Sequence, residues 1–210
     1  MPGVAVIPMF PLGMTVLPGV LLPLHVFEER YVQMVHDLLA DDTAPPEFGV
    51  VMIERGSEVG GGEARSDIGT LCRVLDMSAL AGGRYQLVAS GRARIRVVAW
   101  LPDDPYPLAD VDTWPDEREP PADGSAQIAR LHGRVREINA LVRELGQGEP
   151  PADDEISSDP SLALYHLAAL SPIGASDRLR VLAAPSVEER IEVLDEVLDD
   201  ARAVLDFGRS

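Results

Sequence analysis

The hydrophobic pattern of the chain has a period of two in its first half and a helical period in its second. Four short segments of the first half are rich in β-branched residues and bounded by glycine, which is typical of strands: Phe48–Glu54, Thr70–Met77, Arg84–Ser90 and Arg92–Trp100. In the last segment Arg92, Arg94 and Arg96 alternate with apolar residues, as in a half-buried strand. Gly82-Gly83 predicts a hairpin turn, and Tyr106–Trp114 is predicted to form one more strand, at an edge. Short strands joined by turns predict a small closed or folded-over β-barrel.

One helix is predicted among these strands. The segment Val26–Ala40 carries its apolar residues at helical spacing: Phe27, Tyr31, Met34, Val35 and Leu38. We therefore expect a helix whose apolar face packs on the barrel, with Glu28–Arg30 as the polar side of its first turn.

The apolar stretch that precedes this helix is long enough to cross a bilayer, because no charged residue occurs before Glu28. However, Val4–Phe27 contains four prolines, and each removes a backbone donor that a membrane helix would need. The first basic residue, Arg30, follows the apolar run, which argues against a secretory signal. The stretch therefore predicts buried strands and tight turns, among them a type II turn at Pro18-Gly19, and no membrane association.

Beyond a charged, proline-rich joint at Pro115–Gly124 the period becomes helical. Apolar residues step by three and four along the first segment: Ile128, Leu131, Val135, Ile138, Val142 and Leu145. Asp159 and Pro160 predict the start of a short helix that ends near Leu170, and another helix is predicted over Ser176–Ala183.

A last helix is predicted after a capping box formed by Ser186 and Glu189. The second half therefore predicts about four helices. Taken together, the pattern predicts an α+β protein with a β-rich domain over residues 1–115 and a helical domain over residues 123–210.

The charge balance argues against nucleic acids and anionic membranes as partners. The chain has 18 basic and 35 acidic side chains and a net charge of −17, whereas phosphate groups are bound through Lys and Arg. DNA binding is not expected. RNA binding is disfavoured for the same reason, although the arginines at 92, 94 and 96 could form a local basic patch.

All 18 basic residues are arginine, and the absence of lysine excludes several kinds of chemistry. A phosphate-binding loop, a Schiff base and a Ser–Lys dyad each need a lysine. The single cysteine, Cys72, cannot form an internal disulfide, which fits a cytoplasmic location. Because Cys72 lies in the middle of a predicted strand, we expect it to be a buried apolar residue rather than a nucleophile.

No catalytic, cofactor-binding or metal-binding set is predicted. The four histidines are scattered and do not occur at metal-binding spacing: His25, His36, His132 and His166. Glu28 and Glu29 are adjacent, so they point in different directions on a helix and do not form an acid–base pair. One of them is expected to pair with Arg30 or with a strand arginine. The strand arginines themselves could bind an anion, form internal salt bridges or face solvent.

Several stretches in combination resemble the Lon N-terminal domain family. They are "IPMFPLGMTVLPGVLLPLHVFEERYVQMV", "GGRYQLVASGRARIRV" and "RLRVLAAPSVEERIEVLDEVL", and they follow the family's order from about Val4 to Asp206. The resemblance implies a PUA-like β-barrel subdomain with one packed helix, followed by a C-terminal α-helical bundle.

The resemblance also assigns structural roles to six residues. Phe27, Glu28, Arg30 and Tyr31 match the family's F-E-x-R-Y element, and Gly91 and Arg94 match its strand motif. We interpret these residues as fold-defining. As a hypothesis, Glu28 or another acid pairs with Arg94 across the contact between the helix and the barrel.

In the ATP-dependent protease Lon, this module precedes an ATPase domain and a Ser–Lys peptidase domain and helps to recruit protein substrates. The family's catalytic residues belong to those other domains, so none is assigned here. The resemblance implies a stand-alone, non-catalytic module that binds unfolded polypeptide segments or a partner protein. The candidate binding loop consists of six residues: Ser57, Glu58, Val59, Gly60, Gly61 and Gly62. The alternative is an accessory subunit or remnant of the peptidase S16 family that binds RNA through the barrel.

Overall fold

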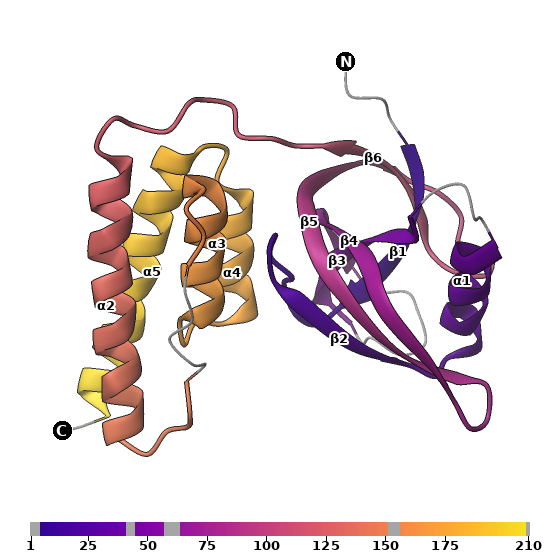
Figure 1. Cartoon of the computed structure of the whole chain (residues 1–210), viewed down its shortest axis with the longest axis horizontal. Coiled ribbons are helices and arrows are strands. Elements are labelled where there is room, and N and C mark those ends of the chain that lie inside the picture. The colour runs from indigo at the N-terminus through magenta and orange to yellow at the C-terminus, as the bar shows by residue number, and fades with distance from the viewer. Residues whose placement is uncertain (1–4, 41–44, 57–63, 151–155, 209–210) are drawn as a thin grey trace. The chain divides into compact units, whose positions relative to one another are not determined.

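The structure, a computed structural model, describes residues 5–40, 45–56, 64–150 and 156–208. The chain divides into two compact units, residues 1–115 and 116–210, which we call the sheet unit and the helical unit. In the described residues, six strands and one helix form the sheet unit, and four helices form the helical unit (Figure 1). The predicted α+β class is confirmed.

The six strands form one mixed sheet that closes on itself. They are β1 Ala5–Leu12, β2 Leu21–Val26, β3 Glu47–Arg55, β4 Ala64–Leu80, β5 Arg84–Trp100 and β6 Leu108–Thr113. Their order is β2-β5-β4-β3-β1-β6, with β1 and β3 parallel and the other pairs antiparallel. β6 pairs with β5 as well as with β1. The five strands β5, β4, β3, β1 and β6 therefore form a closed ring, to which β2 is added at β5. Among the described residues, β2 pairs with β5 alone.

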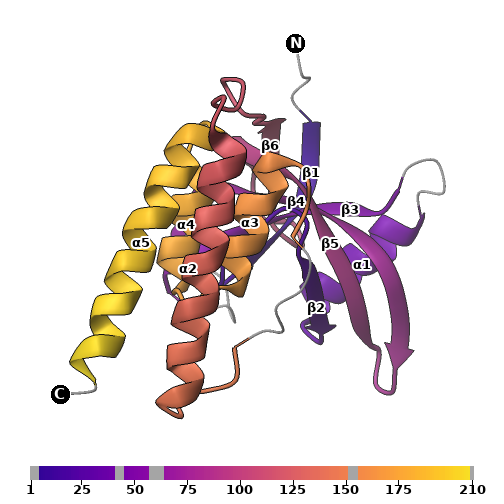
Figure 2. The ribbon, with the colours of Figure 1, turned by 60° about the vertical axis from the view of Figure 1, so that its left-hand side comes forward.

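The longest strands, β4 and β5, form a hairpin that extends well beyond the other strands (Figure 2). Its turn contains Gly82 and Gly83, whose φ angles are 79° and 71°. Residues with a side chain rarely adopt positive φ, so the two glycines allow the chain to reverse. The predicted hairpin turn is confirmed.

A second turn fixes the start of β2. Gly19 has a φ of 81°, and the Val20 amide donates to the Leu17 carbonyl at 3.2 Å, which confirms the predicted turn at Pro18-Gly19. Gly91 of β5 packs directly on this turn: it donates to the Val20 carbonyl at 3.0 Å and accepts from the Gly19 amide at 2.9 Å. A Cβ at Gly91 would lie 2.4 Å from the Leu17 oxygen, so only glycine fits there.

The sequence predicted two strands where the structure has one. Arg84–Ser90 and Arg92–Trp100 were predicted to be separated at Gly91, but β5 runs through this glycine without a break. The residue next to it, Arg92, lies at a shift in the register with β4, because Leu71 pairs with Ala93 and Cys72 with Gly91. The glycine therefore marks a close backbone approach and a bulge rather than a strand end.

Helix α1 (Glu29–Ala40) begins three residues later than predicted. Val26 belongs to β2, and the helix starts where the Glu28 carbonyl accepts from the Tyr31 and Val32 amides. Tyr31, Met34 and Val35 are buried on the sheet, as predicted. Phe27 does not belong to this face: it lies before the helix and is 56% exposed.

The core of the sheet unit has two parts, because alternate side chains of a strand point to opposite faces. One cluster contains Phe10 of β1 with Tyr31 and Met34 of α1. The other contains Met9 of β1 with Ile95 of β5. Adjacent residues of β1 thus contribute to different clusters.

Two polar contacts join α1 to other parts of the sheet unit, namely Tyr85 of β5 and Tyr106, which precedes β6. The Tyr106 hydroxyl donates to Asp37 Oδ2 at 2.8 Å, and His36 Nε2 lies 2.8 Å from the Tyr85 hydroxyl. Burial, together with the hydrogen bond to the Asp37 carboxylate, raises the pKa of Tyr106 to about 12.

The helical unit consists of α2 Gly124–Glu144, α3 Pro160–Leu170, α4 Ala175–Ala183 and α5 Val187–Phe207. Within this unit α2 packs on α3 and α5, and α4 packs on α3 and α5. The predicted caps are confirmed: the Asp159 side chain accepts from the Leu162 amide, and the Ser186 side chain accepts from the Glu189 amide.

A buried arginine organises one end of the helical unit. Arg190 of α5 is fully buried and binds Asp116 at 2.6 Å and 3.3 Å through its two terminal nitrogens. It also donates to Ser161 Oγ at 2.9 Å and lies over the Tyr165 ring at 4.3 Å. The spacing of apolar residues in the sequence of α5 did not predict that a charged residue, Arg190, would lie on the buried face of this helix.

Candidate functional site

Three residues of the F-E-x-R-Y element form a connected group where β2 leads into α1. Arg30 Nε donates to Glu28 Oε2 at 3.2 Å, and the Arg30 guanidinium lies over the Tyr31 ring at 4.6 Å from its centroid. Tyr31 in turn stacks on Phe10 of β1, with ring centroids 4.1 Å apart and planes 17° from parallel. The element therefore joins β1, β2 and α1, which is a structural role.

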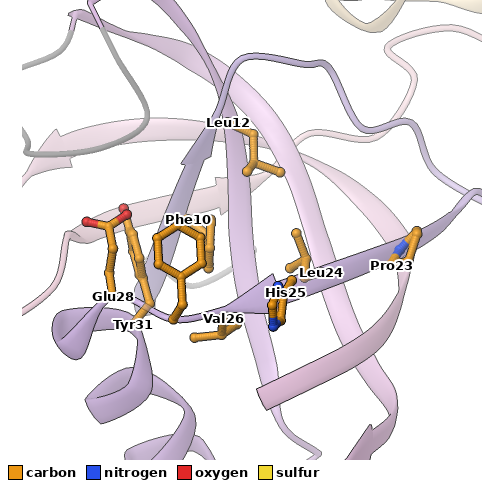
Figure 3. Close-up of a pocket in the computed structure, with 9 residues that line it drawn as sticks. Phe10, Leu12, Pro23, Leu24, His25, Val26, Glu28 and Tyr31 are labelled. Atoms are coloured by element: carbon orange, nitrogen blue, oxygen red, sulfur yellow. The ribbon is translucent and has the colours of Figure 1, made fainter. Parts of the chain in front are cut away.

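A pocket of about 200 Å³ lies beside this group. It is lined by Phe10 and Leu12 of β1, by Pro23, Leu24, His25 and Val26 of β2, and by Phe27, Glu28 and Tyr31 (Figure 3). The lining is mainly apolar, with one carboxylate and one imidazole among its groups. An apolar concave site with a few polar groups is the usual form of a ligand pocket, and this one is small.

Phe27 is an exposed aromatic member of this lining, in which Pro23 and His25 are also exposed. Its side chain is 56% exposed and lies near His25, with ring centroids 6.2 Å apart. A large aromatic side chain gains free energy when it is removed from water, so an exposed one at a pocket is a candidate contact for a ligand. The interpretation of Phe27 as fold-defining is not supported by its position.

The hypothesis paired Arg94 with Glu28 or with another acid, and its Glu28 form is wrong. Glu28 binds Arg30, as the alternative prediction had it. Arg94 is buried in β5 and donates to backbone carbonyls, with Nε 2.8 Å from the Trp114 oxygen and Nη2 3.2 Å from the Pro115 oxygen. Arg94 therefore fixes the chain at the end of the sheet unit rather than binding α1.

The three alternating arginines do not form one basic surface. Arg92 and Arg96 are exposed, whereas Arg94 is 4% exposed. Arg94 and Arg96 also lie over the Trp114 ring, at 4.0 Å and 3.8 Å from its centroid. These cation–π contacts occupy two of the three guanidinium groups. Of the three arginines, only Arg92 and Arg96 are exposed, and RNA binding stays a prediction.

The candidate binding loop, Ser57 to Gly62, lies outside the described residues. Sequence reasoning did not find the pocket. Its residues lie on β1, β2 and the start of α1, and only their pairing in three dimensions brings them together. Pro23 within an apolar strand was the one available signal, because proline in a strand indicates an edge.

The described residues contain little reactive chemistry. Cys72 is fully buried, and desolvation raises the pKa of its thiol to about 12, so the reactive thiolate is strongly disfavoured. In residues 5–40, 45–56, 64–150 and 156–208, no three His, Cys, Asp or Glu side chains gather as a metal site would require. Over the same residues, no helix is long and apolar enough to cross a membrane.

The sequence matches a known family over nearly its whole length. The family model is that of the ATP-dependent protease La (LON) substrate-binding domain, and the match covers residues 6–200. Lon protease 2 of Myxococcus xanthus is 29% identical over 203 residues, which is 95% of this chain and 24% of the relative. Lon protease of Roseiflexus castenholzii is 28% identical over 97% of this chain and 25% of its own length. The chain thus spans about a quarter of these relatives.

Two solved structures share the fold. The Lon N-terminal domain protein from Xanthomonas campestris has a TM-score of 0.64 and 24% sequence identity, with 91% of this chain and 97% of that chain covered. The N-terminal domain of the Mycobacterium avium complex Lon protease also has a TM-score of 0.64, at 18% identity, over 93% of this chain and 99% of that chain. The chain therefore belongs to the family of the LON substrate-binding domain.

Proposed function

We propose that the chain is a non-catalytic module that binds unfolded polypeptide segments or a partner protein. The observation that carries the proposal is the family match over residues 6–200, since the family is described as a substrate-binding domain. As part of the proposal, the closed strand ladder is a PUA-like barrel, the four C-terminal helices form a bundle, and each of residues 1–115 and 123–210 is a domain.

The chemistry of the described residues supports a binding role. The sequence has no lysine, so a Walker-type phosphate loop and a Ser–Lys peptidase dyad have no lysine to use within it. Cys72, the single cysteine, is buried and poorly ionised. We also propose a cytoplasmic location, because a single buried cysteine fits a reducing compartment.

Binding to an unfolded protein is the direct test. The purified chain is titrated calorimetrically with reduced, carboxymethylated α-lactalbumin and, as a matched control, with the native disulfide-bonded form of the same protein. We expect saturable binding of the unfolded form and none of the folded form. Flat isotherms with both forms, together with no partner after pull-down from the native cell, would contradict the proposal.

The non-catalytic part has a separate test. Fluorescein-labelled casein is incubated with the chain, with and without ATP and Mg²⁺, and peptide release and phosphate release are followed together. We expect neither. Turnover that disappears with a single substitution in this chain would overturn this part of the proposal while leaving binding intact.

A further inference from the structure

The pocket runs along the edge of β2 rather than over one face of the sheet. Four successive residues of this strand, Pro23 to Val26, line it. Side chains of a strand alternate between two faces, so a hollow over one face would meet only every second residue. Contact with successive residues places the hollow beside the strand backbone, and Figure 3 shows Phe10 and Tyr31 next to that strand.

The same edge of β2 carries backbone amide and carbonyl groups that are not used in strand pairing within the described part of the chain. β2 pairs with β5 on one side, and in the described residues no strand pairs with its other side. Unpaired amide and carbonyl groups at a sheet edge can accept an added strand. Pro23 lacks an amide proton, which weakens pairing at one position and so protects the edge from uncontrolled aggregation.

The size and chemistry of the pocket fit one large apolar side chain. Its volume is about 200 Å³, and an apolar protein cavity of about 150 Å³ is enough to bind benzene. The buried rings of Phe10 and Tyr31 and the apolar side chains of Leu12 and Val26 supply the walls. The exposed Phe27 ring stands at the pocket and can close over an inserted group.

The negative charge of the sheet unit favours basic residues on either side of the inserted side chain. Residues 1–115 carry 15 acidic and 8 basic side chains, a net charge of −7. Glu28 lines the pocket but is paired with Arg30, so the local negative charge comes from the exposed Glu29 beside it. An acidic segment would be repelled from this edge, whereas Lys or Arg on either side of the inserted residue would be attracted.

We propose that an extended segment of an unfolded polypeptide adds to the open edge of β2 and inserts one aromatic or large aliphatic side chain into this pocket, with basic residues on its flanks. The inference rests on the proposed function and names the site and the chemistry of the segment. It differs from the loop at residues 57–62, which the sequence had indicated.

A short synthetic peptide provides the probe. In a fluorescein-labelled peptide, threonine and valine alternate around a central phenylalanine, with a lysine at each end, and its affinity is measured by fluorescence anisotropy. Three matched peptides change one feature each: the phenylalanine to alanine, the lysines to glutamate, and alternate backbone amides to N-methyl amides. We expect each change to weaken binding about tenfold, because each removes one of the three interactions.

One pair of protein variants locates the site. Phe27→Ala removes an exposed side chain at the pocket, and Val98→Ala removes an equally exposed one elsewhere on the sheet unit, since the two are 56% and 55% exposed. We expect Phe27→Ala to weaken peptide binding about fivefold and Val98→Ala to leave it within about twofold. Both variants should keep the melting temperature of the parent. A photoreactive benzoylphenylalanine at the centre of the peptide should crosslink to residues 23–31.

The outcomes separate the two proposals. If carboxymethylated α-lactalbumin binds but Phe27→Ala and Val98→Ala behave alike and crosslinks fall elsewhere, the β2 site is wrong and the proposed function stands. If the N-methylated peptide binds as well as its parent, strand addition is wrong. If neither the unfolded protein nor any peptide binds, both proposals are overturned.

Discussion

The two units of the chain present different surfaces. Among the described residues, eight large apolar side chains are exposed on the sheet unit, whereas the helical unit exposes two, Val204 and Phe207, both near the end of α5. Both units carry ion pairs at the surface, and in the helical unit they connect helices, as Arg134 of α2 does with Asp195 and Asp199 of α5. Apolar contact with another polypeptide is therefore expected on the sheet unit. The charged surface of the helical unit is expected to stay solvated.

Among the described residues, each unit contains one buried arginine, Arg94 in the sheet unit and Arg190 in the helical unit. Arg94 of the sheet unit donates to backbone carbonyls, whereas Arg190 of the helical unit binds the carboxylate of Asp116. An aromatic ring covers each guanidinium, Trp114 in one case and Tyr165 in the other. A buried ion pair that loses one partner leaves an uncompensated charge.

The largest expected effect concerns the buried ion pair of Arg190 and Asp116. Arg190→Ala should lower the free energy of unfolding of the helical unit by about 3–5 kcal/mol, because Asp116 would remain partly buried without its partner. The control is Arg180→Ala, since Arg180 is an exposed arginine on the neighbouring helix α4 with surface partners; it should cost less than about 1 kcal/mol. Urea unfolding followed by circular dichroism at the helical band measures both. Equal effects would contradict the structural role of Arg190.

The same glycine substitution should have opposite signs in the two units. Gly91→Ala should destabilise the sheet unit by about 1–3 kcal/mol, because the new Cβ would lie 2.4 Å from the Leu17 carbonyl oxygen. Gly133→Ala, in α2, should stabilise the helical unit by about 0.5–1 kcal/mol, since nothing lies within 4 Å of a Cβ there and alanine favours helix.

Tryptophan fluorescence provides a selective readout for this comparison. Both tryptophans, Trp100 and Trp114, belong to the sheet unit, so their emission follows its unfolding, while circular dichroism is dominated by the helical unit. A loss of stability on Gly133→Ala, or none on Gly91→Ala, would show that the local packing is misassigned.

A smaller effect should appear in alkaline solution. The thiol of Cys72 has an ordinary pKa of 9.0, which burial raises to about 12 in the fold. The unfolded chain therefore loses this proton first, and the folded state loses relative stability as the pH rises from about 9 to 12. Between pH 7 and pH 10, ionisation of Cys72 in the unfolded chain should lower the free energy of unfolding of the sheet unit by about 1 kcal/mol. Cys72→Ala should not show this decrease. The difference between parent and variant at pH 7 and pH 10 isolates this contribution from that of Tyr106.

The smallest expected effect concerns the exposed end of α5. Phe207 is 86% exposed, so Phe207→Ala should change the free energy of unfolding by less than about 0.5 kcal/mol. It should also leave peptide binding within about twofold, in contrast to Phe27→Ala. If Phe207→Ala weakened binding of unfolded protein strongly, the helical unit would share the binding surface and the contrast between the units would fail.

Much of the fold could be predicted from the sequence, because its signals are local. Turn glycines, helix caps and apolar periodicity marked Gly82-Gly83, Asp159 and Ser186 correctly. Gly91 was predicted to end a strand, but β5 continues through it. The sequence alone does not distinguish a glycine that ends a strand from one that lets another backbone segment pack closely. That distinction depends on Leu17, which is distant in the chain.

The site could not be predicted in the same way. Phe27 fits the helical period of the following segment, and its exposure follows from the start of α1 at Glu29, after the Glu28 carbonyl accepts the first helical bonds. The pairing of Glu28 with Arg30 was one of two alternatives, and only the burial of Arg94 against Trp114 decides between them. The position of Arg94 depends on long-range packing, whereas the exposure of Phe27 depends on the residue at which α1 begins.

The buried position of Cys72 has a practical consequence for spectroscopy. Maleimide reagents attack thiolates at accessible sites, and the native sulfur meets neither condition near neutral pH. A cysteine newly introduced on the surface would thus be the only one to take up a dye or spin label, without prior removal of the natural residue. Labels of this kind can be placed one at a time along the exposed edge of the sheet unit to follow the arrival of a bound chain.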